Sequence, residues 1–109
     1  MSAAKRKGTA WESAIVRALR EHGHPHAERR ALGGAADRGD VAGLPGVVIE
    51  AKASTHLELA SWIAELDAEM ANDGADLGAV WHKRRGKSSP LDGYVTMPGH
   101  VFLRLLAER

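Results

Sequence analysis

The segment of residues 47–53, "VVIEAKA", constrains the fold more than any other. It is a short, largely apolar run that follows the turn composition "PG", which is typical of a β-strand. Successive side chains of a strand point to opposite faces, so Val48, Glu50 and Lys52 share one face and the apolar odd-numbered residues share the other. The apolar face predicts packing on a helix, and the charged face requires a separate explanation.

Hydrophobic periodicity predicts the elements around this strand. Apolar residues at helical spacing end at Gly23 and Pro25, and turn compositions separate the strands that follow. The expected elements are a helix at 9–22, strands at 26–32, 39–44 and 47–53 (the last two a hairpin), a helix from an N-cap at Ser54 or Thr55 to Gly74 with an acidic outer face, strands at 77–82 and 93–97, and a helix after Pro98. The sequence therefore predicts an α/β fold in the order α-β-β-β-α-β-β-α, with a mixed central sheet flanked by helices. We expect residues 1–8 to form a flexible basic arm and residues 9–109 to form a single domain.

Composition excludes several classes of function. The 109-residue chain has no cysteine, which excludes disulfides, thiolate catalysis and cysteine-ligated zinc. No apolar run approaches the roughly 18 residues of a membrane span, so we expect no membrane association and a cytoplasmic location. Because 15 basic residues face 14 acidic ones, an argument for nucleic-acid binding must rest on where the charges cluster. The clusters are Lys5, Arg6 and Lys7; Arg29 and Arg30; and Lys83, Arg84, Arg85 and Lys87.

The expected hairpin suggests a metal site. A turn centred on Pro45 places Asp40 directly opposite Glu50, with side chains on the same face. Two carboxylates in opposed positions destabilise a sheet unless a cation lies between them. Mg²⁺ binds carboxylate and carbonyl oxygens, so the arrangement predicts a Mg²⁺ site in which Mn²⁺ is expected to substitute.

Lys52 adds the remaining element of a hydrolytic site. A lysine beside the metal can hold or deprotonate the attacking water, while the metal stabilises charge that develops on a phosphate. The alternative is that Glu50 and Lys52 are solvent-facing residues of a one-sided sheet. The opposed position of Asp40 favours a site that hydrolyses phosphodiesters.

The pattern of Asp40 followed by Glu50-Ala51-Lys52 resembles that of the PD-(D/E)xK, restriction-endonuclease-like nucleases. The resemblance implies a restriction-endonuclease-like fold in which Asp40, Glu50 and the main-chain carbonyl of Ala51 bind Mg²⁺. It also implies that Lys52 helps to activate water.

A narrower resemblance is to the archaeal-type Holliday junction resolvases, over about residues 5 to 55. Like that family, "KRKGTAWE" places a glutamate, Glu12, four residues after the glycine of a basic "RKG". Arg29 or Arg30 stands where the family has an arginine before the acidic motif. This resemblance implies a catalytic role for Glu12, a four-way or otherwise branched DNA substrate and a two-fold symmetric homodimer, since two strands must be cut.

Several alternatives remain open. Thr9-x-x-Glu12 also matches a capping box, in which the glutamate binds the N-cap amide. The basic clusters are either solvated charges or contacts to DNA phosphates, of which we favour DNA contacts. The same fold could also belong to a nuclease that cuts nicked, flapped or linear duplex DNA, to a DNA-binding module without cleavage, or to a protein-interaction domain.

Overall fold

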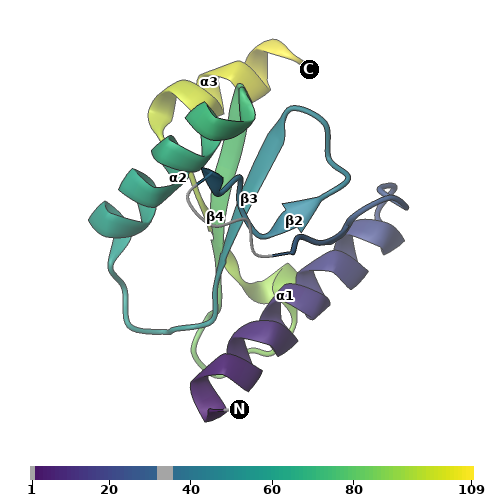
Figure 1. Ribbon diagram of the computed structural model, residues 1–109, viewed down its shortest axis with the longest axis vertical. Coiled ribbons are helices and arrows are strands. Elements are labelled where there is room, and N and C mark those ends of the chain that lie inside the picture. Colours follow the sequence, from purple (N-terminus) through teal and green to yellow (C-terminus); the bar gives the residue numbers. More distant parts are fainter. Residues whose placement is uncertain (1, 32–35) are drawn as a thin grey trace.

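The computed structural model describes residues 2–31 and 36–109, and within them the chain has an α/β fold (Figure 1). The predicted α/β class is confirmed. The elements are α1 (Ala3–Glu21), β1 (Glu28–Arg29), β2 (Val41–Ala42), β3 (Val47–Lys52), α2 (Leu59–Asp73), β4 (Leu77–His82), the 3₁₀ helix η2 (Pro90–Asp92), β5 (Tyr94–Thr96) and α3 (Gly99–Ala107). None of the helices in this part of the chain is long and apolar enough to cross a membrane.

The strands form two small sheets. In the larger sheet β3 runs parallel to β4, from Val47 opposite Leu77 to Lys52 opposite His82, and β5 is antiparallel to β4. The parallel pairing of β3 and β4 requires a crossover, which α2 provides. The smaller sheet is the antiparallel pair β1–β2.

The predicted hairpin between residues 39–44 and 47–53 is wrong as a strand ladder. β2 pairs with β1 instead, with Val41 opposite Arg29. The backbone after β2 approaches the His26 carbonyl so closely that only glycine fits at position 43, because a Cβ there would overlap that carbonyl. The β2 segment still contacts β3 through the Asp40 N–H, which donates to the Ile49 carbonyl at 2.8 Å.

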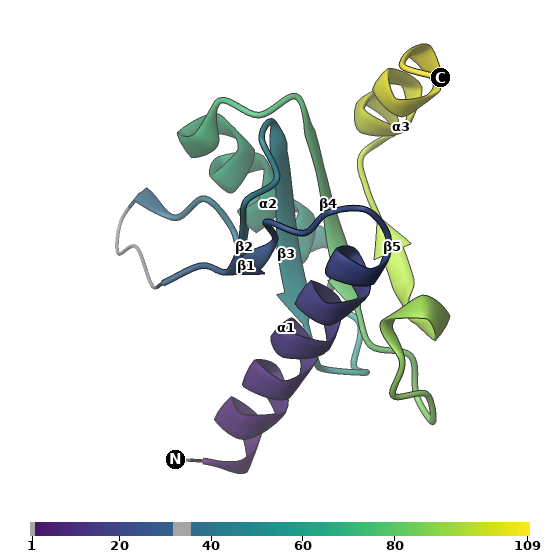
Figure 2. The same cartoon turned by 90° about the vertical axis from the view of Figure 1, so that its right-hand side faces the viewer.

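The larger sheet is covered on both faces, as the alternation in β3 predicts. Ile49 packs with Trp11 and Ile15 of α1 on one face, and Val48 packs with buried residues of α2 and α3 on the other. Figure 2 shows α1 and α2 on opposite sides of β3. The expected packing of the apolar odd-numbered face on a helix is confirmed, and the even-numbered face of β3 faces α2.

The first helix begins earlier than expected. α1 begins at Ala3, with Ser2 as its N-cap, and the Ser2 hydroxyl accepts a hydrogen bond from the Lys5 N–H at 3.1 Å. The prediction of a flexible arm at residues 1–8 is therefore wrong for residues 3–8, and Met1 lies outside the described residues. Alanine, lysine and arginine favour helix, which explains the extension across Gly8. Because Thr9 lies inside α1, the capping-box explanation of Glu12 is also wrong.

Two further element boundaries differ from the expectation. α2 begins at Leu59, because the Ser54 hydroxyl forms a local turn by accepting the His56 N–H at 3.1 Å rather than capping the helix. Its predicted end is confirmed, since Gly74 adopts the left-handed conformation with φ of 73°. The strand expected at 26–32 is limited to β1, and the end of that predicted range, Leu32, lies outside the described residues.

Candidate active site

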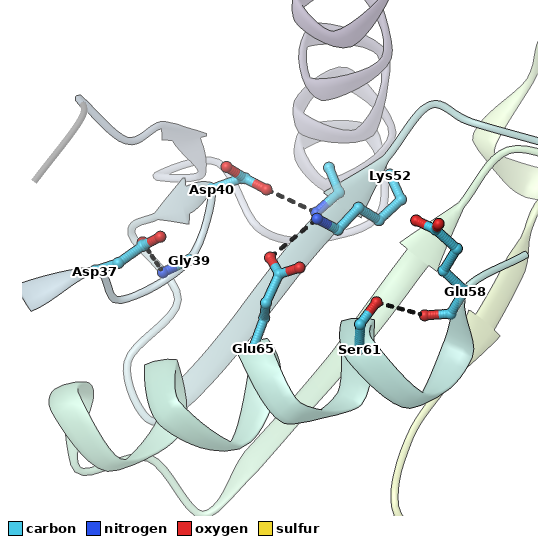
Figure 3. Close-up of polar contacts among 8 residues, drawn as sticks. Asp37, Gly39, Asp40, Lys52, Glu58, Ser61 and Glu65 are labelled. Atoms are coloured by element: carbon cyan, nitrogen blue, oxygen red, sulfur yellow. Dashed lines mark hydrogen bonds and ion pairs between the residues drawn. The ribbon is translucent and has the colours of Figure 1, made fainter. Parts of the chain in front are cut away.

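Glu50 lies at the centre of the site. It is in the middle of β3, on the face that packs against α2, and only 5% of its surface is exposed. The alternative that Glu50 is a solvent-facing sheet residue is therefore wrong. Two residues further along the strand, the partly buried Lys52 extends toward α2, where its Nζ lies 3.0 Å from Glu65 Oε2 (Figure 3).

Asp40 is held beside Glu50 by main-chain contacts. Its Oδ2 accepts a hydrogen bond from the Ala51 N–H at 2.8 Å (Figure 3). Its own N–H donates to the Ile49 carbonyl. Its carboxylate consequently interacts with that of Glu50. The predicted proximity of Asp40, Glu50 and Lys52 is present, although two local hydrogen bonds produce it rather than a regular hairpin register.

The carboxyl groups of this site have raised pKa values. Burial, together with the neighbouring Glu50, raises the pKa of Asp40 to about 8. Burial likewise raises the pKa of Glu50 to about 8, with Glu69 adding to the increase, and burial raises the pKa of Glu69 to about 7. Each increase reflects negative charge that is neither hydrated nor neutralised. A bound cation would lower all three pKa values.

An acidic cluster formed by Asp37, Glu50 and Glu69 could hold a metal ion. One carboxylate oxygen from each residue lies within 4.8 Å of the other two, and Glu69 is only 3% exposed. Carboxylate oxygens are the ligands of hard cations such as Mg²⁺, Mn²⁺ and Ca²⁺. The residues present therefore fit a divalent cation.

Neither Asp37 nor Glu69 was predicted as a site residue. We expected the acidic residues of α2 to face solvent, but Glu69 lies three residues after Leu66 and seven after Trp62, both of which are buried. Residues at these spacings share one helix face, so the helical periodicity contained a usable signal for Glu69. Asp37 lies in an irregular segment, where no periodicity indicates its direction.

Lys52 is a cation in this environment. Burial by itself lowers the pKa of the Lys52 ammonium group, but the carboxylates of Glu65, Glu50 and Asp40 have the larger combined effect and raise it. A lysine with a raised pKa is a poor proton acceptor near neutral pH. The environment therefore favours a role for Lys52 in holding water or stabilising negative charge over a role as a base.

Glu12 reaches the same site from α1. Its Oε1 lies 3.1 Å from the Arg29 guanidinium, and burial followed by the charge of Asp40 raises its pKa. Glu12 also lines an open pocket of about 450 Å³. The charged residues that line this pocket are Lys5, Glu12, Arg29, Arg30 and Asp40. The structure thus brings together residues of α1, β1 and the segment that carries Asp40.

The other predicted DNA-contacting residues lie in two places. Arg6 and Lys7 are exposed on the first turns of α1. The basic loop of residues 83–87 begins beside the site, because the Lys83 N–H donates to the Lys52 carbonyl at 3.0 Å. Within this loop the Arg84 guanidinium lies 5.7 Å from the centre of the Tyr94 ring, and Arg85 and Lys87 are exposed.

The site geometry therefore rests on α1, β3, α2 and the segment before β2. Comparison of the chain with models of protein families, with curated proteins and with solved structures found no match. The resemblance of Asp40 and Glu50-Ala51-Lys52 to a nuclease motif stays a prediction.

Proposed function

We propose that this protein is a Mg²⁺-dependent DNA endonuclease of the restriction-endonuclease-like type, with four-way or other branched DNA as its preferred substrate. The observation that carries the proposal is the pair of neighbouring carboxylates, the buried Glu50 and the half-buried Asp40, with Lys52 following on the same strand face as Glu50. Buried like charges are costly and are concentrated at functional sites.

Asp40, Glu50 and the main-chain carbonyl of Ala51 would hold the cation. The donor set consists of oxygen atoms, which suits Mg²⁺ and also Mn²⁺. When bound, the cation supplies positive charge that offsets the negative charge developing on a phosphate. This requirement explains why the fold retains carboxyl groups whose ionisation is unfavourable in its absence.

The other side chains position the reactants. Hydrolysis joins the oxygen of water to phosphorus and breaks one P–O bond, so the leaving oxygen departs with one proton and the second proton is released to solvent. The Lys52 ammonium group can donate a hydrogen bond to the attacking water and stabilise the added negative charge. Glu12, which is held by Arg29 near Asp40, extends the acidic side of the site.

Basic residues would hold the DNA backbone on both sides of the acids. Lys5 and Arg30 line the pocket that also contains Asp40, and the basic loop of residues 83–87 begins beside Lys52. Phosphate contacts of this kind supply much of the affinity for DNA without reading sequence. Selection of a branched substrate by shape is consistent with this arrangement.

The proposed homodimer would use β5 and α3. An apolar groove of about 210 Å³ lies between the strand face and α3, and its lining includes Val95 and Leu105. On the same helix Phe102 and Leu103 are 54% and 66% exposed. A second copy covering this surface would bury the apolar side chains and place two sites about one axis. Sedimentation of wild type and of Phe102→Glu tests this proposal. Wild type should sediment as a dimer and the charged variant as a monomer.

The function is tested by cleavage of a labelled four-way junction and a matched linear duplex. Wild type should nick the junction symmetrically in Mg²⁺, whereas Asp40→Asn and Lys52→Ala should bind it without cutting. Asp67→Asn, an exposed change on α2, is the matched control and should behave as wild type. Cutting of both DNAs would indicate a less selective nuclease, and binding by wild type without cutting would contradict the proposed enzymatic activity.

A further inference from the structure

Two carboxylates outside the proposed catalytic motif, those of Asp37 and Glu69, lie next to Glu50. Oxygen atoms of the three groups lie within 4.8 Å of one another, and Asp40 is not a member of this group. Asp40 instead interacts with Glu50 while its Oδ2 accepts the Ala51 N–H. Glu50 therefore belongs both to the pair with Asp40 and to the cluster with Asp37 and Glu69.

One oxygen of the Glu69 side chain lacks the partner that burial would normally require. Its Oε1 is inaccessible to solvent and accepts no hydrogen bond from the described residues. Burying an unpaired polar atom costs free energy, and a charged oxygen costs more than a neutral one. Because Glu69 is 3% exposed and its carboxylate faces Glu50 and Asp37, a cation between these groups would satisfy it.

The segment that carries Asp37 is fastened to the end of α2. The Asp37 carbonyl accepts a hydrogen bond from Asn72 Nδ2 at 2.8 Å, and the Arg38 guanidinium lies 3.7 Å from Asp73 Oδ1. Asp37 Oδ1 also accepts the Gly39 N–H at 2.9 Å (Figure 3). These contacts hold the Asp37 carboxylate toward Glu69 although the two charges repel each other.

Charge balance argues for more than one cation. The carboxylates of Asp37, Asp40, Glu50 and Glu69 would together carry four negative charges, and Lys52 is already paired with Glu65. One divalent ion at Asp40 and Glu50 would leave the charges of the exposed Asp37 and the buried Glu69 uncompensated. Since a carboxylate has two oxygens, Glu50 can contribute one oxygen to each of two ions.

We propose that Asp37, Glu50 and Glu69 form a second divalent-cation site, which shares Glu50 with the proposed catalytic ion. This inference rests on the proposed function, because it takes Asp40 and Glu50 as the first site. The second ion would neutralise the acidic end of α2 and fix the segment that carries Asp40, only three residues after Asp37. Two-ion sites in phosphodiester-cleaving enzymes can also stabilise both the attacking and the leaving oxygen.

The test is the number of Mn²⁺ ions bound by the DNA-free protein, measured by electron paramagnetic resonance. Wild type and the Asp67→Asn control should bind two ions per chain, and Glu69→Gln and Asp40→Asn should each bind one. The isosteric changes keep the packing volume, and circular dichroism would verify folding of each variant.

The possible failures are distinguishable. One ion in wild type that Glu69→Gln retains and Asp40→Asn loses would overturn the second site and leave the proposed catalytic ion intact. One ion that both variants lose would indicate a single shared site and would also overturn the inference. No bound Mn²⁺ in any variant would count against both the second site and the proposed metal-dependent function.

Discussion

Replacing Glu50 with glutamine is expected to stabilise the metal-free protein near neutral pH while abolishing its proposed activity. Burial raises the pKa of Glu50 from 4.5 to about 8, so the folded state keeps a proton that the unfolded chain loses above about pH 4.5. A folded state that binds more protons than the unfolded state loses stability as the pH rises. The contribution of Glu50 therefore becomes increasingly unfavourable between about pH 4.5 and about pH 8.

The magnitude follows from the pKa difference. One pKa unit corresponds to about 1.4 kcal/mol, so at about pH 7 the unfavourable contribution of Glu50 is about 3 kcal/mol. At about pH 5 the same reasoning gives less than ~1 kcal/mol. Glutamine has nearly the same shape, cannot ionise and can donate its amide hydrogens to Asp40 or Glu69. The variant should thus gain about 3 kcal/mol over wild type at about pH 7 and little at about pH 5.

Urea unfolding in the presence of a chelator measures this difference, with fluorescence of the buried Trp11 and Trp62 as the signal. Glu28→Gln, an exposed change in β1, is the control and should leave the stability unchanged at both pH values. Addition of Mg²⁺ should stabilise wild type and have little effect on Glu50→Gln. An equal stability difference at the two pH values, or a variant less stable than wild type at about pH 7, would refute the reasoning.

Three further predictions concern the surroundings of the site. Glu65→Gln should lower the pKa of Lys52, which pairs with Glu65 at 3.0 Å. A ¹⁵N NMR titration of the Lys52 ammonium group measures this pKa, and an unchanged value would contradict the effect assigned to Glu65. Gly39→Ala should cost more than ~2 kcal/mol in urea unfolding, because its φ is 94° and a Cβ would lie 2.9 Å from a main-chain oxygen. Gly46→Ala, with φ of 76° and nothing within 4 Å, should cost only about 1 kcal/mol, and equal losses would refute the argument from close contact. Arg85→Ala should weaken DNA binding and reduce the slope of its salt dependence by about 1, which fluorescence anisotropy at several salt concentrations would show.

Local patterns in the sequence predicted most of the helices and strands and the strand face that carries Glu50 and Lys52. Alternation along residues 47–53 placed Glu50 and Lys52 on one strand face, because the two-residue period of a strand is a local property. The run of residues 77–82 and Gly74 likewise marked β4 and the end of α2. The proximity of Asp40 to Glu50 also followed from the short connection between them, even though the assumed hairpin did not form.

Tertiary structure alone decided what surrounds these residues. The pairing of β2 with β1 depends on the close contact of Gly43 with the His26 carbonyl, which joins segments distant in sequence. The burial of Glu50 depends on α2, which covers the even-numbered face of β3 and brings Glu69 toward it. Asp37 joins them because side chains at the end of α2 hold its segment. The sequence supplies the acidic residues of the cluster, but only folding brings their charges close together, so that a cation would stabilise them.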